Sequence, residues 1–261
     1  MFEFFKTIVK NVSQIRLDGW IPDCIDQRDR QFSSASSSIS IKNSVDLRPH
    51  CSDIENQRTT GSCVAQATVG SLELLENLQG IPFTDLSRLY VYYNARLAIN
   101  QANVDKGSRI RDAMASLSSV GVCSEASWPF VISKVNVKPG WSEYREGYIH
   151  RLSGYYSITG TGQDRIDQIK KSLSADHGVV FAVSVYENFM PGSPLAPPPS
   201  GRLKGGHAML IVGYDSGTKT FIVRNSWGTD WADGGYFLCK EDWLDQCNCK
   251  DVWVPTVTVK F

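Results

Sequence analysis

The sequence predicts an α+β protein with two lobes, a helical lobe followed by a β-rich lobe. Helical periodicity runs through residues 45–130, whereas short β-branched segments dominate residues 140–261. The chain has 261 residues, 42% of them hydrophobic, which is enough for one large core or two modest ones. We expect an N-terminal arm over 1–40, a mainly helical lobe over 41–135 and a β-rich lobe over 136–261.

The arm is expected from its composition. The segment Gly19–Asp23 is rich in turn-forming residues and contains one anchoring aromatic residue, Trp20. The serine run Ser33–Ser38 has the composition of a flexible linker. We expect the folded body to begin near Val45.

Three helices are expected in the first lobe. The longest covers Val64–Leu78, is apolar on most faces and should therefore be buried, and Gly80 and Pro82 follow it as stop signals. Thr84 is a candidate cap for a second helix that extends to Leu97. Ser108 is a candidate cap for a third helix that extends to Val120.

The second lobe is expected to hold one helix, over Arg165–Leu173, and several strands. The strands are expected where apolar, β-branched segments occur, at 179–185, 208–212, 220–223, 236–238 and 253–259. Pro191–Gly206 contains five prolines and four glycines, so we expect a long surface loop there.

Charge and hydropathy exclude several classes of protein. The 27 Lys and Arg residues equal the 27 Asp and Glu residues, so we expect no nucleic-acid partner. No apolar run reaches the roughly 18 residues of a membrane span. Residues 1–10 are too short and too charged for a signal-peptide core, which leaves a cytoplasmic location and export by a non-classical route both open.

The chain has seven cysteines, and one of them, Cys63, is expected at or next to the start of the long buried helix. The positive end of a helix dipole favours the thiolate, which is the reactive form, although buried free cysteines are common and mostly inert. The six others permit three disulfides without requiring any, and we expect Cys51, Cys123 and Cys239 to be buried or bridged. Cys247 and Cys249 are too close together for a zinc knuckle, so we expect no metal.

A histidine and an asparagine are expected to meet in the second lobe. His207 enters an apolar strand from a glycine-rich turn, and 18 residues later the next strand ends in Asn225-Ser226-Trp227. If the two strands form a hairpin, the Asn225 amide can accept a hydrogen bond from the imidazole and fix its tautomer. Trp227 would shield that hydrogen bond from water. Alone, His207 would be an ordinary strand-end residue and Asn225 an ordinary turn residue.

Taken together, these residues resemble the papain-like cysteine peptidases. The resemblance extends from Val45 to about Tyr236, and the Gly19–Asp23 segment is similar to the arm of microbial members. Cys63 precedes His207 by 144 residues, a spacing typical of the family, and Asn225 by 162, slightly more than is typical. The matching elements are Gln57, Gly61-Ser62-Cys63, His207-Ala208, Asn225–Gly228, Trp231 and Gly234–Tyr236.

The resemblance implies a catalytic role for each matched residue. Cys63 would be the nucleophile, and His207 the general base that later acts as the acid for the leaving amine. Asn225 would orient His207, and Trp227 would cover that pair. Gln57 would donate its side-chain amide to the oxyanion, together with the backbone N–H of Cys63.

The resemblance also implies where substrate binds. Gly107 and Ser108 align with the backbone strip that pairs with substrate. Ile110, Ala182 and Gly205 fall where the family builds its main specificity pocket, which implies an apolar pocket. No metal or organic cofactor is implied, and the expected partner is a peptide or protein substrate bound by a monomer.

Three positions depart from the family pattern. Thr60 stands where a cysteine usually forms a bridge, Val64 replaces an aromatic residue, and Gly206 replaces a polar residue before the histidine. None of these changes removes a chemical role, but the first two leave the oxyanion geometry and the pH profile open.

The function expected from this resemblance is peptide hydrolysis through a thioester on Cys63. Residues 1–40 are expected to act as a short propeptide that covers the cleft and is anchored by Trp20, which would make the chain a zymogen. A purely structural arm is the alternative. The alternative functions are an inactive peptide-binding module and an amidase or transferase on the same scaffold.

Overall fold

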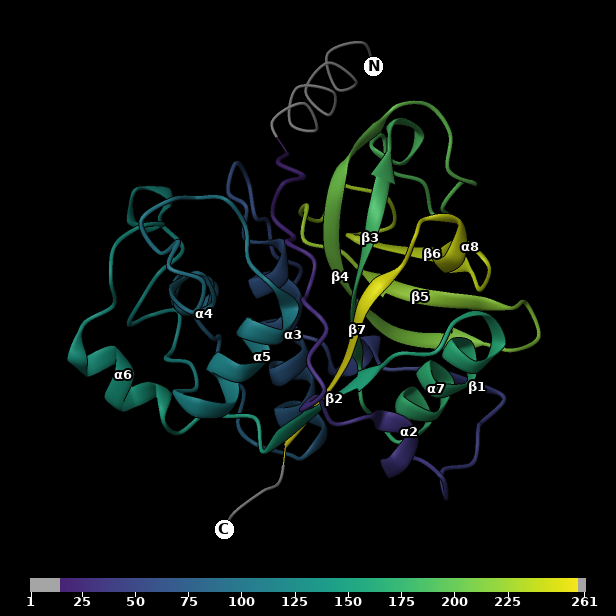
Figure 1. Cartoon of the computed structure of the whole chain (residues 1–261), viewed down its shortest axis with the longest axis horizontal. Coiled ribbons are helices and arrows are strands. Elements are labelled where there is room, and N and C mark those ends of the chain that lie inside the picture. The colour runs from purple at the N-terminus through teal and green to yellow at the C-terminus, as the bar shows by residue number, and fades with distance from the viewer. Residues whose placement is uncertain (1–14, 258–261) are drawn as a thin grey trace.

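The computed structural model describes residues 15–257 and has two halves (Figure 1). Helices α4, α5 and α6 lie on one side, the antiparallel sheet lies on the other, and helix α3 stands between them. The first described residues, drawn in purple, run down between the two halves. The two-lobed α+β prediction is therefore confirmed.

Helix α3, Cys63–Leu78, is the centre of the core. Every residue from Cys63 to Glu76 is buried, because the helix packs against strand β4 on one side and against α4 and α5 on the other. The apolar pattern predicted this helix to within one residue of its start, since a helix that is apolar on most faces must be enclosed.

The other helices of this half are α4 (Arg88–Leu97), α5 (Ile110–Ser119) and α6 (Trp141–Gly147). The prediction that Thr84 caps α4 was wrong, because Ser87 accepts the hydrogen bond from the Tyr90 N–H at 3.2 Å. The prediction that Ser108 caps α5 was also wrong. The residue before α5 is Arg109, which makes no side-chain cap.

Helix α6 extends the helical half beyond residue 135. The Tyr144 hydroxyl donates to Asn94 Oδ1 at 2.6 Å, and the Val122 N–H donates to the Gly147 carbonyl at 3.1 Å. The chain crosses to the sheet only at about residue 151, shortly before strand β2 begins.

Within residues 15–257 the sheet has seven strands, in the order β2-β7-β3-β4-β5-β6, with β1 paired to β4. The strands are β1 (Ser44–Asp46), β2 (Gly154–Ile158), β3 (Val179–Tyr186), β4 (Leu203–Asp215), β5 (Thr220–Arg224), β6 (Tyr236–Lys240) and β7 (Lys250–Thr256). The sheet is accompanied by α7 (Gly162–Ser174), which contacts β2, β3 and β4, and by the short α8 (Trp243–Gln246), which contacts β6.

The strand predictions were right in place but inexact in length. Strand β4 begins at Leu203 rather than 208, so the last part of the expected surface loop is sheet. Strand β7 begins three residues earlier than expected, at Lys250, and the end of the expected 253–259 strand lies outside the described residues. Strands β1 and β2 were not predicted, because β1 has only three residues and because Gly154 and Ser157 interrupt the apolar pattern of β2.

The serine run is not a flexible linker. It overlaps helix α2, Phe32–Ala35, whose Phe32 is buried with its ring 6.4 Å from the Tyr156 ring in an edge-to-face arrangement. Ser36 is almost fully buried as well. The linker prediction failed because it considered only the serines. Phe32, which precedes them, holds the segment against strand β2.

A buried ion pair joins α3 to α4. Arg88 donates to both carboxylate oxygens of Glu73, at 2.8 and 2.6 Å, and neither side chain is more than 1% exposed. Glu73 also accepts from the Ser52 hydroxyl at 2.6 Å and from the Leu86 N–H at 2.9 Å. The pair therefore ties the segment before α3 and the start of α4 to the central helix.

We predict that Glu73→Gln lowers the free energy of unfolding by about 3 kcal/mol, because the buried Arg88 cation loses its fully buried partner and keeps only the more exposed carboxylates of Asp85 and Glu55. Chemical denaturation followed by tryptophan fluorescence measures the change. The control is Asp176→Asn, which removes an exposed ion pair to Lys42 at 3.5 Å and should change stability by less than about 1 kcal/mol. Equal effects of the two substitutions would contradict the prediction.

Candidate active site

Cys63 is the first residue of helix α3, and its side chain is fully buried. The turn before it is held by the Thr60 hydroxyl, which lies 2.7 Å from the Ser62 hydroxyl, and by the Gly61 N–H, which donates to Asp105 Oδ1 at 2.9 Å. Burial raises the pKa of the Cys63 thiol to about 12, although the backbone N–H groups of Ala208 and Val64 act in the opposite direction. In this state the residue is a neutral thiol.

His207 and Asn225 are joined as the hairpin prediction required. Strands β4 and β5 pair antiparallel, and His207 Nε2 lies 2.7 Å from Asn225 Oδ1. An amide oxygen only accepts, so Nε2 carries the proton and Nδ1 presents a lone pair. Burial lowers the pKa of His207 to about 4, so the ring is neutral.

An aromatic cluster closes the site on the far side of this pair. The Trp227 ring lies 4.7 Å from the imidazole, with 32° between the two planes. Behind it Phe189 contacts four aromatic rings, with centroid separations of 5.2 to 5.7 Å, namely those of Trp227, Trp231, Phe237 and Trp243. The cluster keeps water away from the histidine and asparagine, which strengthens their hydrogen bond.

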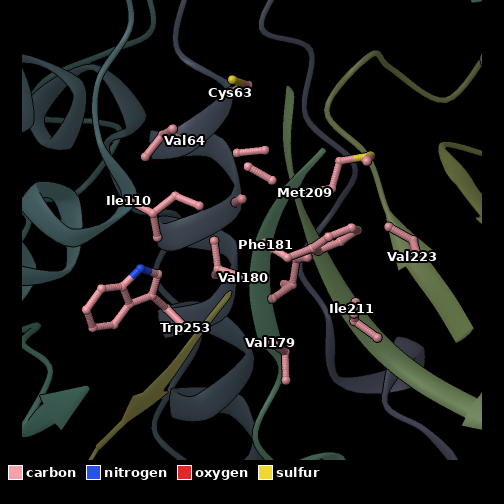
Figure 2. Close-up of a cluster of buried hydrophobic side chains, with 14 of the residues drawn as sticks. Cys63, Val64, Ile110, Val179, Val180, Phe181, Met209, Ile211, Val223 and Trp253 are labelled. Carbon is pink, nitrogen blue, oxygen red and sulfur yellow. The ribbon is translucent and has the colours of Figure 1, made fainter. Parts of the chain in front are cut away.

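The thiol and the imidazole come from opposite sides of the same packing surface. The Ala208 N–H, which acts on the Cys63 thiol, belongs to the residue after His207 on β4. Figure 2 shows Cys63 at one end of α3 above a cluster of buried apolar side chains, with Met209 on the neighbouring strand. Within the described residues His207 Nδ1 is buried and has no hydrogen-bond partner. The packing of α3 on β4 therefore brings the two reactive groups into one site.

Gln57 is fully buried next to this site, and its side chain is held at both ends. Its Oε1 accepts from the Ser226 hydroxyl at 3.0 Å, and its Nε2 donates to the Thr60 carbonyl at 3.1 Å. The same Nε2 also donates to the carbonyl of Arg16, an arm residue, at 3.3 Å. The amide that sequence analysis assigned to an oxyanion is therefore in contact with a carbonyl oxygen of the arm.

The strip formed by Gly107 and Ser108 binds the arm as well. The Ser108 N–H donates to the Gly19 carbonyl at 3.0 Å, and the Ile21 N–H donates to the Ser108 carbonyl at 3.0 Å. On the opposite side the Gly206 N–H donates to the Leu17 carbonyl at 2.7 Å. Arm residues 17–21 thus form backbone hydrogen bonds with both halves of the molecule.

The arm passes directly over the Cys63 thiol. A Cβ added to Gly19 would lie 2.7 Å from Cys63 Sγ and 2.8 Å from the Gly61 carbonyl oxygen. Gly206 is equally restricted, because a Cβ there would lie 2.4 Å from the Trp20 ring. The glycine that departs from the family pattern before the histidine is therefore explained by the arm.

Three residues were expected to form the specificity pocket, and the specificity pocket stays a prediction. Ile110 and Ala182 are fully buried apolar residues, and Gly205 contacts Leu17 of the arm. Sequence analysis missed Asp251, whose Oδ2 accepts from the Trp20 indole N–H at 2.7 Å. The hydrophobic pattern did not indicate Asp251, because the strand that contains it was expected to begin only at residue 253.

Residues 15–257 contain no metal cluster, no membrane-spanning helix and no disulfide. No group of His, Cys, Asp and Glu side chains there could hold a metal ion, and no helix is long and apolar enough to cross a membrane. All seven cysteines lie in this part of the chain, and each is a free thiol, so no disulfide is formed in the structure. Cys123 and Cys239 are buried, and Cys51 is half-buried.

The fold and the site define a papain-like cysteine protease. Residues 41–256 match the model of the papain family of cysteine proteases, and the chain belongs to that family.

The chain is 34% identical to an uncharacterized peptidase C1-like protein of Acanthamoeba polyphaga mimivirus, over 82% of this chain and 72% of that protein. It is 27% identical to a cathepsin B-like protein of Giardia intestinalis, over 77% of this chain and 70% of that protein. Among solved structures it resembles xylellain, a cysteine protease from Xylella fastidiosa, with a TM-score of 0.82 and 30% identity over 92% of this chain and 96% of that chain.

We predict that Gly19→Ala increases the alkylation rate of Cys63 in the full chain by roughly tenfold, because overpacking of this size costs about 1–3 kcal/mol and displaces the arm. Mass spectrometry of the intact chain after iodoacetamide treatment measures the rate. Gly217→Ala is the control, since a Cβ at this exposed turn meets only an Asp215 oxygen, at 3.2 Å. An unchanged rate in Gly19→Ala would show that the arm does not restrict access to the thiol.

Proposed function

We propose that this chain hydrolyses peptide bonds through a thioester on Cys63 and that its N-terminal arm restrains this activity. The observation that carries the proposal is the hydrogen bond of 2.7 Å from His207 Nε2 to Asn225, which leaves the Nδ1 lone pair free on the buried ring. A base with a fixed tautomer beside a thiol at a helix N-terminus is the arrangement that nucleophilic catalysis requires.

The steps follow from the positions of these groups. His207 Nδ1 takes the thiol proton, and the thiolate attacks the carbonyl carbon of the substrate to form a tetrahedral intermediate. The oxyanion accepts hydrogen bonds from Gln57 Nε2 and the Cys63 N–H, each typically worth about 2.7–4 kcal/mol of barrier. The intermediate collapses to a thioester, the imidazolium protonates the leaving amine, and water then hydrolyses the thioester with His207 as the base.

The position of the arm supports the proposed restraint, because the arm contacts each group that a substrate would need. Arg16 lies on the Gln57 amide, Gly19 lies on the thiol, and residues 19 and 21 pair with Ser108. Burial is the main cause of both the raised pKa of Cys63 and the lowered pKa of His207, and burial disfavours an ion pair between them. Departure of the arm would admit water, reduce both shifts and favour the thiolate–imidazolium pair.

Four side-chain interactions anchor the arm to the body. Arg16 pairs with Asp105 at 2.7 Å, Trp20 donates to Asp251 at 2.7 Å and Asp23 accepts from Trp253 at 2.8 Å. Further along, Arg111 Nε donates to Asp29 Oδ1 at 2.9 Å. These contacts are spread over both halves of the molecule, which favours a segment that docks and undocks as a unit over a disordered leader.

The test compares the full chain with a chain that lacks residues 1–30, which keeps the α2 anchor Phe32 in place. We predict that removal of the arm raises cleavage of fluorogenic peptides at least tenfold, because the thiol, the Gln57 amide and the Ser108 strip are all uncovered. Cys63→Ala should abolish cleavage in the shortened chain, whereas Cys51→Ala, at a half-buried thiol elsewhere, should not.

The outcomes separate the alternatives. Equal cleavage and equal alkylation of the two chains would contradict the restraint by the arm. A shortened chain that binds peptides but cleaves none would favour the inactive peptide-binding module, and one that acts only on non-peptide amides or on acyl acceptors would favour an amidase or transferase.

The restraint should weaken as the pH rises. Burial, with a contribution from nearby Asp251, raises the pKa of Asp23 from 3.8 to about 7, although the Trp253 N–H and Arg111 act in the opposite direction. A docked arm therefore holds a proton that a released arm, with an ordinary carboxyl pKa, gives up. The contribution of this carboxyl to docking is complete below about pH 3.8 and is lost as the pH rises through about 7.

We predict that the alkylation rate of Cys63 in the full chain, divided by the rate in the full-length Asp23→Asn variant, increases at least tenfold between pH 5 and pH 8. The asparagine cannot ionise, so the division removes the titration of the thiol itself. A ratio that is flat with pH would contradict the role of Asp23. Alkylation followed by intact-mass spectrometry at constant ionic strength provides the measurement.

A further inference from the structure

A small cavity lies between helix α3 and strands β4 and β5, behind the residues of the candidate site. Its walls include Gln66 and Ala67 of α3, residues 208–210 of β4 and residues 224–226 at and after the end of β5. Its volume is about 10 Å³, which is about the least that a single water molecule needs. The question is therefore which polar groups face this space.

The Asn225 amide presents a donor to the cavity. Its Oδ1 accepts from His207 Nε2 at 2.7 Å and from the Ser226 N–H at 2.8 Å, so the amide oxygen lies on the side of the imidazole. The Nδ2 group consequently points away from the imidazole. It is buried, and within residues 15–257 it has no hydrogen-bond partner. A buried amide N–H of this kind needs an acceptor, because an unpaired donor destabilises the fold.

The Gln66 amide presents an acceptor to the same cavity, and a chain of hydroxyl groups fixes its orientation. The Thr60 hydroxyl donates its only proton to the Gln57 carbonyl, at 2.8 Å. The Ser62 hydroxyl, 2.7 Å from that of Thr60, must then be the donor between the two. Ser62 Oγ is left to accept, and Gln66 Nε2 donates to it at 3.2 Å. Gln66 Oε1 therefore points away from Ser62, and it is buried without a partner among the described residues.

The charged side chains on the wall of the cavity have partners elsewhere. Arg224 Nη2 donates to the Ser52 hydroxyl at 3.1 Å, and Glu55 lies 3.4 Å from the Arg88 guanidinium. The Ser226 hydroxyl donates to Gln57. The two buried amide atoms are thus the polar groups of the wall that are free to bind a ligand within the described part of the chain.

We propose that this cavity binds one water molecule, which accepts from Asn225 Nδ2 and donates to Gln66 Oε1, and that Gln66 is thereby a positioning residue for His207. The proposal rests on the peptidase function proposed above and adds a residue to it. A donor and an acceptor on the walls of one small polar cavity are the partners that a buried water requires. The water completes the hydrogen bonding of both amides.

The bridge holds the Asn225 carboxamide at both ends and strengthens its oxygen as an acceptor. Hydrogen bonds that share one amide polarise one another, so an N–H that has its own acceptor makes the carbonyl oxygen more negative. That oxygen faces His207 Nε2, and it stabilises the positive charge that the ring gains when Nδ1 takes the thiol proton. Gln66 thus acts on the imidazole without touching it.

A crystal structure of the full chain tests the bridge directly. We expect one water within about 3.2 Å of both Gln66 Oε1 and Asn225 Nδ2. An empty cavity, or two amides in direct contact, would overturn the proposal.

The positioning role is tested with Gln66→Met, which removes the acceptor and leaves an apolar wall of similar volume. The hydrogen-exchange rate of the His207 Nε2 proton is measured by NMR in the full chain labelled with ¹⁵N, relative to the backbone amides of β3, which report opening of the fold. We expect this rate to rise roughly tenfold, and the alkylation rate of Cys63 by iodoacetamide to fall roughly tenfold.

Two further variants separate this role from a general loss of packing. Gln66→Glu keeps an oxygen acceptor on the cavity side in either protonation state, so it should restore most of both rates. Gln168→Met is the matched control and should leave both unchanged. Gln168 is also a buried helical glutamine, but its Nε2 donates to Asp164 at 2.8 Å, on helix α7.

The outcomes distinguish this proposal from the proposed function. Equal exchange and equal alkylation in Gln66→Met and Gln168→Met would overturn the role of Gln66, while a reactive Cys63 would leave the peptidase proposal standing. If Cys63 reacts in no variant but the water and the exchange effect are found, the peptidase proposal is overturned and the positioning of the imidazole by Gln66 stands. Faster exchange that is confined to Gln66→Met and reversed in Gln66→Glu supports the proposal.

Discussion

The site depends on the hydrogen bond between His207 and Asn225, which exists because strands β4 and β5 pair in one register. His207 and Asn225 are 18 residues apart in the sequence, and the pairing of the two strands brings them together. The same strand, β4, packs against α3, whose first residue is Cys63, so one strand positions the imidazole relative to both the Asn225 amide and the thiol. The aromatic cluster around Phe189 then keeps water from the hydrogen bond.

The arm binds through features that would serve a substrate equally well. It uses backbone hydrogen bonds to Ser108 and Gly206, a carbonyl on the Gln57 amide, and close contact at Gly19, where no side chain fits over the thiol. In the proposed function, restraint by the arm and recognition of a substrate would use the same groups. The side-chain contacts of the arm reach both halves of the molecule, through Asp105 on one side and Asp251 and Trp253 on the other.

Long periodic elements were predicted well, and features that depend on distant partners were not. Helix α3 was placed to within one residue, because an apolar helix that is enclosed on most faces carries its own signal. Ser108 was predicted to cap α5, but the helix begins one residue further on, after Arg109. The backbone N–H and carbonyl of Ser108 instead bind Gly19 and Ile21, which lie almost ninety residues away in the chain. The serine run was mistaken for a linker, since Phe32 gains its packing partner, Tyr156, only in the folded chain.

The sequence by itself determined the family, and it singled out Gln57, Cys63, His207 and Asn225 as candidate site residues, because residue types in a fixed order record the chemistry that such a site requires. It also determined the elements that carry these residues, through hydrophobic periodicity that acts over a few neighbouring positions. Only the tertiary structure decided that Gly19 of the arm lies on the Cys63 thiol and that Asp251 accepts a hydrogen bond from the Trp20 indole. These contacts join residues more than forty positions apart, and no local pattern specifies which distant surfaces meet.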